Sequence, residues 1–322
     1  KQVRIPAVAT ALAALMSMPS VPLAPHVSPV DELTRLAAAL GPAAPRLFMK
    51  RDDLLSFGGG GNKVRKMQTV AAEAVAAGAD MLITCGGVQS NHARVTAAAG
   101  AALGLDVVLI LNGRPPVPPT ANLRLDHLFG AAVRFVDARA DRAPAMQDAA
   151  DAHRAAGRRP FIVPVGASTP TGALGFARAV GELAASGLRP DVIVHATSSG
   201  GTQAGLVAGC ALFGLKARII GVSADDSSET LGATIRAILA GIAARLGARP
   251  ESVGAQARLE VDDTQVGGGY GVPTPASTEA LELVARREGV LLDPVYTAKA
   301  MAGLLSRVRS GELGPGDTVL FW

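Results

Sequence analysis

The sequence predicts an α/β fold with doubly wound parallel sheets that are covered by helices on both faces. Short apolar runs alternate with alanine-rich stretches of helical spacing along most of the chain. The apolar runs are continuous instead of alternating with polar residues, which is typical of parallel strands buried on both faces. The chain has 322 residues, 49% of them hydrophobic and 18% charged, which is enough for a sizeable core and two domains.

The expected elements alternate in order along the chain. Strands are expected at short, mainly apolar runs, at 46–50, 81–85, 107–111, 133–136, 161–165, 192–196, 217–222 and 318–321. Helices are expected where alanine-rich stretches lie between these strands, at 64–77, 92–103, 121–129, 143–156, 172–186 and from Thr202 onward. A proline-rich linker at 115–119 interrupts the pattern. Polar glycine loops follow several strands, and the carboxyl ends of parallel strands are where such folds bind ligands.

Composition narrows the functional class. The formal net charge is +4 and aromatic residues make up 3%, so neither a basic run nor a base-stacking surface points to nucleic acid. No apolar run reaches the roughly 18 residues of a membrane span. The two cysteines, Cys85 and Cys210, are far apart, which supports neither a zinc site nor a disulfide framework, and no metal is expected. A cytoplasmic location is the expectation.

The first twenty residues combine basic and apolar residues. Lys1 and Arg4 precede the apolar run 7–16, which has the form of a weak signal peptide; the alternative is an extended arm and a short helix. The chain begins with Lys and stops at Trp322 within an expected strand, which leaves truncation of either end open.

Lys63 follows the glycines 58–61 and Asn62 at the expected start of a helix. Glycines give the backbone freedom and let a large ligand approach closely. Burial near a helix N-terminus favours the neutral, nucleophilic form of a lysine. No Ser or Thr follows the lysine, so the loop is not of the Walker A type. An exposed lysine on a surface turn is the alternative that these residues leave open.

The segment 85–94 lies between an expected strand and helix and contains Gln89, Ser90 and Asn91. Ser90 or Asn91 can cap the helix. The same helix terminus, with these three side chains, can also donate to a carboxylate or phosphate.

The segment 197–205 has the same position in the pattern, and its hydroxyls and glycines predict a phosphate cradle. Its glycine spacing is not GxGxxG. Because Asp225 and Asp226 follow the next strand, a dinucleotide loop stays open as a weaker alternative, as does a plain turn.

The two tyrosines of the chain, Tyr270 and Tyr296, both lie in segments rich in turn residues. From the residues alone, core packing with a satisfied hydroxyl is favoured over a role as proton donor or ring contact.

Together these segments resemble the D-cysteine desulfhydrase / 1-aminocyclopropane-1-carboxylate (ACC) deaminase family, in the tryptophan-synthase-β-like group of pyridoxal-phosphate (PLP) enzymes. The matching segments occur in the family's order and are 50–53 (KRDD), 60–66 (GGNKVRK), 86–91 (GGVQSN), 201–205 (GTQAG) and 292–296 (LDPVY). The resemblance implies PLP fold type II with a larger cofactor domain, 1–64 and 166–322, and a smaller domain, 65–165. It also implies a homodimer and a small amino-acid substrate.

The resemblance implies a role for each candidate residue. Lys63 would carry PLP as a Schiff base and act as the base at Cα. The other cofactor-binding residues would be Asn62, Asn91, Ser199, Gly200, Gly201, Thr202 and Thr297. The substrate carboxylate would be held by Gln89, Ser90 and Asn91, and Ser90 would assist proton movement. Tyr270 and Tyr296 would face the substrate. D-cysteine would yield pyruvate, sulfide and ammonia.

Two departures from the family pattern bear on the substrate. ACC deaminases carry an acidic residue, which meets the pyridine nitrogen, at the position of Thr297, so the resemblance favours the desulfhydrase branch. Desulfhydrases carry a His-Thr-Gly-Gly segment whose hydroxyl serves that nitrogen, and it would begin after Trp322. The resemblance therefore implies a fragment or a partner for the nitrogen on another element. ACC deaminase, a cysteate lyase releasing sulfite and an inactive ligand-binding relative stay as alternatives.

Overall fold

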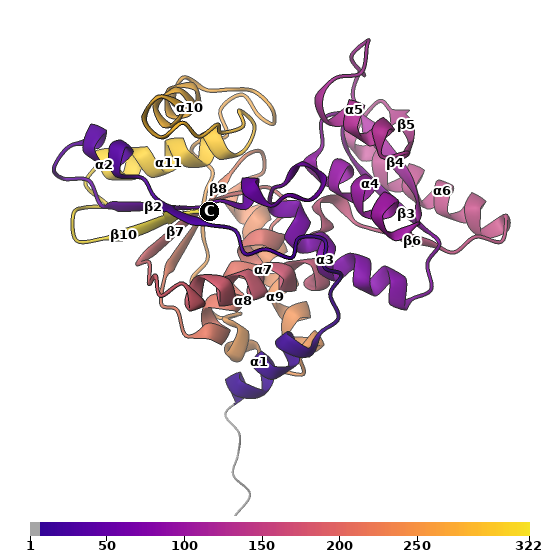
Figure 1. The fold of residues 1–322 in the computed structure, drawn as a ribbon, viewed down its shortest axis with the longest axis horizontal. Helices are drawn as coiled ribbons and strands as arrows, with labels where there is room; N and C mark the ends of the chain where they lie inside the picture. The colour runs from indigo at the N-terminus through magenta and orange to yellow at the C-terminus, as the bar shows by residue number, and fades with distance from the viewer. Residues whose placement is uncertain (1–6) are drawn as a thin grey trace, which may run out of the picture. The chain divides into compact units, whose positions relative to one another are not determined.

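The computed structural model describes residues 7–322, which divide into two compact units (Figure 1). The larger unit contains the described residues up to Met16, together with Ser28–Asp52 and Phe176–Trp322. The smaller unit contains Ser17–Val27 and Asp53–Gly175. Lys1 and Arg4, on which the signal-peptide interpretation depends, lie outside the described residues. The domain boundaries expected from the sequence stay a prediction.

The larger unit is built on a six-stranded sheet of order β1-β2-β10-β7-β8-β9. Its strands are β1 (Val30–Glu32), β2 (Arg46–Lys50), β7 (Val192–Thr197), β8 (Arg218–Ser223), β9 (Glu260–Asp262) and β10 (Thr318–Phe321). All neighbours run parallel except β1, which pairs antiparallel with β2 at the edge. The central strands β7 and β10 consist mainly of buried apolar residues, as a sheet covered on both faces requires.

Helices cover both faces of this sheet (Figure 1). On one face α2 (Thr34–Leu40), α10 (Pro275–Glu288) and α11 (Thr297–Arg309) enclose a core that includes Leu36, Met301 and Val319. On the other face α7 (Pro170–Ala185) and α8 (Gly201–Phe213) pack on Ile193 and Leu320. Helix α9 (Ser228–Arg245) packs beside α8 and β9, and α1 (Ala7–Ser17) is tied to α7 where Arg178 donates to the Leu15 carbonyl at 3.0 Å.

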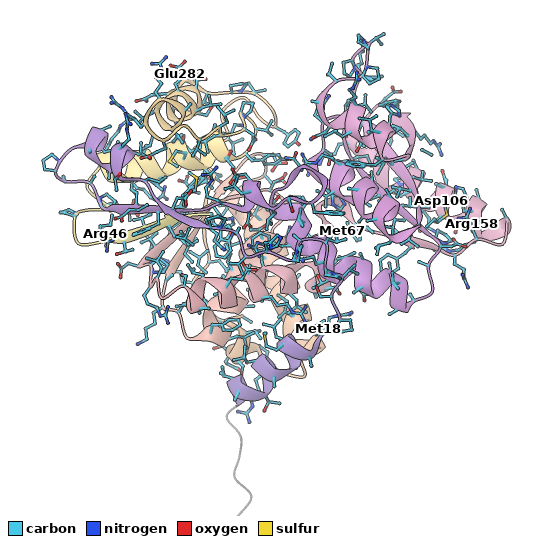
Figure 2. All side chains as sticks on the ribbon, viewed as in Figure 1. Met18, Arg46, Met67, Asp106, Arg158 and Glu282 are labelled. Carbon is cyan, nitrogen blue, oxygen red and sulfur yellow. The ribbon has the colours of Figure 1, made fainter. Side chains whose placement is uncertain are left out.

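The smaller unit is built on a four-stranded parallel sheet of order β5-β4-β3-β6. Its strands are β3 (Met81–Gly87), β4 (Asp106–Asn112), β5 (Ala132–Val136) and β6 (Pro160–Ile162). The helices α3 (Asn62–Ala76), α4 (Asn91–Leu103) and α5 (Ala121–Leu128) share one core with Leu82 and Leu109, and α6 (Arg142–Ala155) covers Ile83 and Ile110. In Figure 2, Arg158 and Asp106 lie side by side, and their ion pair of 2.6 Å joins the segment after α6 to the start of β4.

The predicted fold class is confirmed: the protein is α/β with two mostly parallel sheets. Every expected strand and helix has a counterpart, with one shortened. The strand expected at 161–165 ends at Ile162 because Pro164 has no N–H to donate and a 3₁₀ turn with Gly166 at φ 69° follows. The sequence analysis did not identify β1, α2, α9, β9, α10 or α11. None of the helices in residues 7–322 is both long and apolar enough to cross a membrane.

Candidate active site

The glycine loop before Lys63 is shaped by close backbone contacts in the smaller unit. Gly60 has φ 72°, and a Cβ added there would lie 2.5 Å from the carbonyl oxygen of Asp53 and 2.8 Å from that of Leu55. Gly61, at φ 95°, is the N-cap of α3. Only glycine fits such a conformation without strain. The loop therefore places Lys63 in the first turn of α3, half-buried, with its Nζ donating to Asn62 Oδ1 at 3.3 Å.

Arg94 of α4 fastens this loop. Its Nη2 donates to the Gly60 carbonyl at 2.7 Å, and its Nη1 donates to Asn91 Oδ1 at 3.3 Å and Asn122 Oδ1 at 3.1 Å. The guanidinium is buried, where hydrogen bonds to a charged donor are strong. Arg94 therefore fixes the position of the glycine loop relative to Asn91.

The Gln89–Asn91 segment is fastened from its other side by Asn122 at the start of α5. Asn122 Nδ2 donates to the Gln89 carbonyl at 2.8 Å and to Asn91 Oδ1 at 2.9 Å, and its backbone N–H donates to Gln89 Oε1 at 2.9 Å. Ser90 caps α4 by accepting from the Ala93 N–H at 3.2 Å. The structure thus brings Gln89, Ser90 and Asn91 together at one helix terminus. The sequence analysis missed Arg94 and Asn122 as supports, because nothing in a linear sequence shows which distant loop a side chain will reach.

Two lysines and a histidine of this unit, Lys63, Lys66 and His92, lie close enough to interact electrostatically. Lys66, one turn beyond Lys63, is fully buried and donates to Ser168 Oγ at 3.0 Å and the Gly166 carbonyl at 3.3 Å. Burial, and then the charge of Lys63, hold the pKa of Lys66 well below its usual value. The pKa of His92 is also held well below its usual value by burial and by both lysines. Such surroundings favour an anionic ligand.

His92 is held in one tautomer. The Thr84 hydroxyl donates to the Val163 carbonyl at 2.7 Å, so it accepts from His92 Nε2 at 2.7 Å. Because its pKa is lowered, His92 is a neutral ring that carries its proton on Nε2.

Asp126 of α5 is a buried carboxylate beside Arg94. Neither of its oxygens has a hydrogen-bond partner among residues 7–322. Burial raises the pKa of Asp126 to about 7, and the charge of Arg94 opposes that rise. The carboxyl group therefore titrates near neutral pH.

In the larger unit, the Ser199–Thr202 segment turns from β7 into α8. Gly200, at φ 74°, is the N-cap of α8, and Gly201 and Thr202 are buried in its first turn. The hydroxyl of Thr197, at the end of β7, is buried without a hydrogen-bond partner within the described part of the chain. Backbone N–H groups at a helix N-terminus bind phosphate well. The segment has the form of an anion cradle with an unused hydroxyl beside it.

The two tyrosines meet in the larger unit. Their hydroxyls are 2.5 Å apart and their rings are 5.7 Å apart in an edge-to-face arrangement. Tyr270 is 47% exposed, whereas the pKa of Tyr296 is raised far above its usual value by burial and by its neighbours Tyr270, Asp225 and Asp293. The expectation that core packing is the favoured use of both tyrosines is wrong for Tyr270, because nearly half of that side chain is exposed.

Thr297 is the first residue of α11, and its hydroxyl is bonded to Asp293. It donates to Asp293 Oδ2 at 2.7 Å, and Asp293 also accepts from the N–H groups of Tyr296 at 2.7 Å and Thr297 at 3.0 Å. Asp293 therefore caps α11, a role that the sequence analysis did not assign. An Asp-Pro pair favours the start of a turn, so the sequence carried a signal for a turn before the helix but not for this cap.

Taken separately, each unit holds residues of a kind that fits one part of PLP. The smaller unit holds a half-buried lysine at a helix start, and such an amine can carry an aldehyde. The larger unit holds the phosphate-type cradle with the unpartnered hydroxyl of Thr197. Within residues 7–322 no cluster of three or more His, Cys, Asp or Glu side chains is arranged to hold a metal ion. Both cysteines are free and buried, and burial raises the pKa of Cys210 to about 12.

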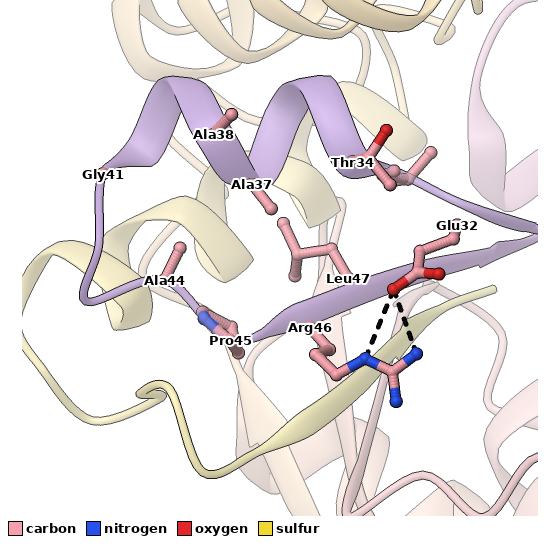
Figure 3. Close-up of a pocket in the computed structure, with 10 residues that line it drawn as sticks. Glu32, Thr34, Ala37, Ala38, Gly41, Ala44, Pro45, Arg46 and Leu47 are labelled. Atoms are coloured by element: carbon pink, nitrogen blue, oxygen red, sulfur yellow. Dashed lines mark hydrogen bonds and ion pairs between the residues drawn. The ribbon is translucent and has the colours of Figure 1, made fainter.

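A pocket of about 320 Å³ lies elsewhere, between α2 and the start of β2 (Figure 3). Arg46 and Glu32, paired at 3.1 Å, lie on its rim. None of the predicted site residues lines it. This pocket is therefore not part of the candidate active site.

The fold and these residues define a PLP-dependent enzyme of fold type II, and the sequence matches the family "Pyridoxal-phosphate dependent enzyme" over residues 21–322. A solved structure described as an ACC deaminase homologue is 36% identical with a TM-score of 0.89, covering 97% of this chain and 93% of that one.

Relatives with named activities show which family of PLP-dependent enzymes the chain belongs to. The ACC deaminase of Burkholderia cenocepacia is 38% identical, and the D-cysteine desulfhydrase of Salmonella newport is 37% identical; each comparison covers 95% of this chain and 94% of the relative. The chain belongs to the ACC deaminase / D-cysteine desulfhydrase family of PLP-dependent enzymes. The resemblance seen in the sequence and the expected cofactor are thereby confirmed.

Proposed function

We propose that this enzyme catalyses α,β-elimination of D-cysteine, giving pyruvate, sulfide and ammonia. The observation that carries the proposal is Thr297. In ACC deaminases the residue after this tyrosine is acidic and meets the pyridine nitrogen, whereas here it is a neutral hydroxyl engaged with Asp293. An uncharged partner stabilises a protonated pyridine ring less than a carboxylate does. Expulsion of a thiolate makes smaller demands on the cofactor than opening a cyclopropane ring does, and it suits this site.

The cofactor, when bound, supplies an electron sink for a carbanion at Cα. The side chains of this enzyme do the remaining work. Lys63 would hold the cofactor through its amine, and that amine would take the Cα proton. Gln89, Ser90 and Asn91, held at the N-terminus of α4, bind the substrate carboxylate. The S–Cβ bond then breaks, the sulfur leaves as sulfide, and one water replaces the nitrogen, so that cysteine and water balance pyruvate, ammonia and hydrogen sulfide.

The side chains of the proposed site are held in position by residues outside it. Arg94 and Asn122 hold Asn91 and the glycine loop, so the donor set is preorganised before a substrate arrives. Ser199–Thr202 are assigned to the phosphate, with Asn62 and Thr297 as further cofactor contacts. Tyr270 and Tyr296 are assigned to the substrate, and the strong preference of Tyr296 for its neutral form suits it to donate a hydrogen bond instead of acting as a base.

ACC deamination is the second candidate, supported by the names of several relatives. The homodimeric state and the cytoplasmic location implied by the resemblance stay predictions.

The test compares products from three substrates given to the PLP-loaded enzyme. D-cysteine and L-cysteine are assayed for sulfide, and ACC for ammonia. We expect sulfide from D-cysteine, none from the Lys63→Ala variant, and parent-like release from a Lys216→Ala control, since Lys216 is exposed. Ammonia from ACC without sulfide from D-cysteine would contradict the proposal and establish the second candidate.

A further inference from the structure

Lys299 is a fully buried lysine in the first turn of α11, one turn after Tyr296. Its Nζ donates to three backbone carbonyls: Val266 at 2.8 Å, Gly269 at 2.9 Å and Ala224 at 3.3 Å. An ammonium has three N–H donors, so all three are used. A neutral amine would leave one carbonyl without a donor, which indicates that the charged form is the one this arrangement fits.

The burial of this ammonium is costly. A buried cation loses its hydration, and a cation near a helix N-terminus also faces the positive end of the helix dipole. Burial lowers the pKa of Lys299, while the nearby Asp225 opposes that change. A methionine of similar length would avoid both costs. The arrangement therefore calls for a role beyond filling space.

The three carbonyls belong to the loops that surround the tyrosine pair. Ala224 follows β8 and precedes Asp225, which receives a hydrogen bond from Ser198 at 3.2 Å. Val266 and Gly269 belong to the loop after β9, and Gly269, at φ 113°, immediately precedes Tyr270. Lys299 thus joins the helix that carries Tyr296 to the loop that carries Tyr270.

We propose that Lys299 is a positioning residue whose ammonium acts as a tethered cation, binding a cage of three carbonyl oxygens and so holding Tyr270 against Tyr296. This role for Lys299 rests on the proposed function in one respect: the tyrosine pair is assigned to the substrate. A cage of carbonyl oxygens around a positive charge is also the environment of an alkali cation. Removal of the lysine side chain therefore leaves a site that a small free cation can fill.

The chain's two tyrosines give a direct readout, because phenolate absorbance at 295 nm reports on this pair alone. In the parent, burial and the neighbouring Tyr270, Asp225 and Asp293 hold the pKa of Tyr296 far above its usual value. In Lys299→Met the two loops are released and Tyr296 gains solvent, so its pKa falls toward about 10 and phenolate rises by about one tenth of a group per chain at about pH 9. The comparison is made at this pH because Lys299 in the parent, whose pKa lies below its usual value, loses its charge at higher pH. The control Lys216→Met removes an exposed lysine and keeps the parent titration. A parent-like titration in Lys299→Met would overturn the proposal.

The second variant, Lys299→Ala, tests the cage itself. We expect potassium or rubidium chloride, but not tetramethylammonium chloride of equal ionic strength, to restore the parent titration. A Lys299→Ala chain that folds only with the small cations supports the same conclusion. Equal behaviour in all three salts, or failure to fold in each, would assign Lys299 a purely structural role and overturn the proposal. Since the titration needs no substrate, loss of the D-cysteine assignment would leave its result unaffected.

Discussion

Replacement of Gly60 by alanine tests whether the glycine loop before Lys63 is set by backbone contacts. The added Cβ would lie 2.5 Å from the Asp53 carbonyl oxygen and 2.8 Å from that of Leu55, at φ 72°. A left-handed conformation costs a non-glycine residue about 1–2 kcal/mol. Forcing extra atoms into a packed site costs about 1–3 kcal/mol more. Backbone carbonyls cannot rotate away as a side chain can, so we expect Gly60→Ala to lower the free energy of unfolding by about 2–5 kcal/mol.

Gly78 provides a matched control in the same unit. It has φ 69°, but an added Cβ would meet no heavy atom within 4 Å. Gly78→Ala should therefore cost only the conformational part, about 1–2 kcal/mol. Urea unfolding followed by circular dichroism measures both losses, and a PLP titration should show weaker cofactor binding for Gly60→Ala alone. Equal losses of stability in the two variants would refute the reasoning.

Two further predictions concern carboxylates. Asp126 has a folded-state pKa of about 7, which is above its unfolded value. From about pH 4 to 7 the unfolded chain therefore binds fewer protons at this group than the folded chain does. The free energy of unfolding falls as the pH rises through that window. Between pH 5 and 8 the parent should lose on the order of 2 kcal/mol relative to Asp126→Asn in urea unfolding, and parallel pH profiles would exclude this titration. Asp293→Ala removes the cap of α11 and should cost about 1–2 kcal/mol by the same measurement, whereas an unchanged midpoint would show that the cap contributes nothing.

The strands were predictable because parallel strands in a covered sheet must be continuous apolar runs. The elements that the sequence analysis did not identify were overlooked for different reasons. β1 has three residues and no pattern to detect. Helix α10, in contrast, carried clear signals: Thr274 as N-cap, Pro275 in the first turn and Gly289 after the last.

The candidate site was predictable as far as its motifs are local. Lys63, Ser90 and Gly200 each stand in a glycine or polar loop at a helix start, and their order along the chain pointed to the family. Arg94 and Lys299 were not recognisable as supports, because each acts through backbone carbonyls of loops that are distant in sequence. A carbonyl is present at every residue, so the sequence carries no signal of which one is used.

The assignment of Lys63 as the cofactor-bearing lysine is tested most directly by reducing the PLP-loaded enzyme with borohydride. Reduction fixes the cofactor on the amine that carries it, and peptide mass spectrometry then identifies that amine among the six lysines. The account predicts a pyridoxyl group on Lys63. A pyridoxyl group on Lys66 instead, or on no lysine of a protein that binds PLP, would contradict it.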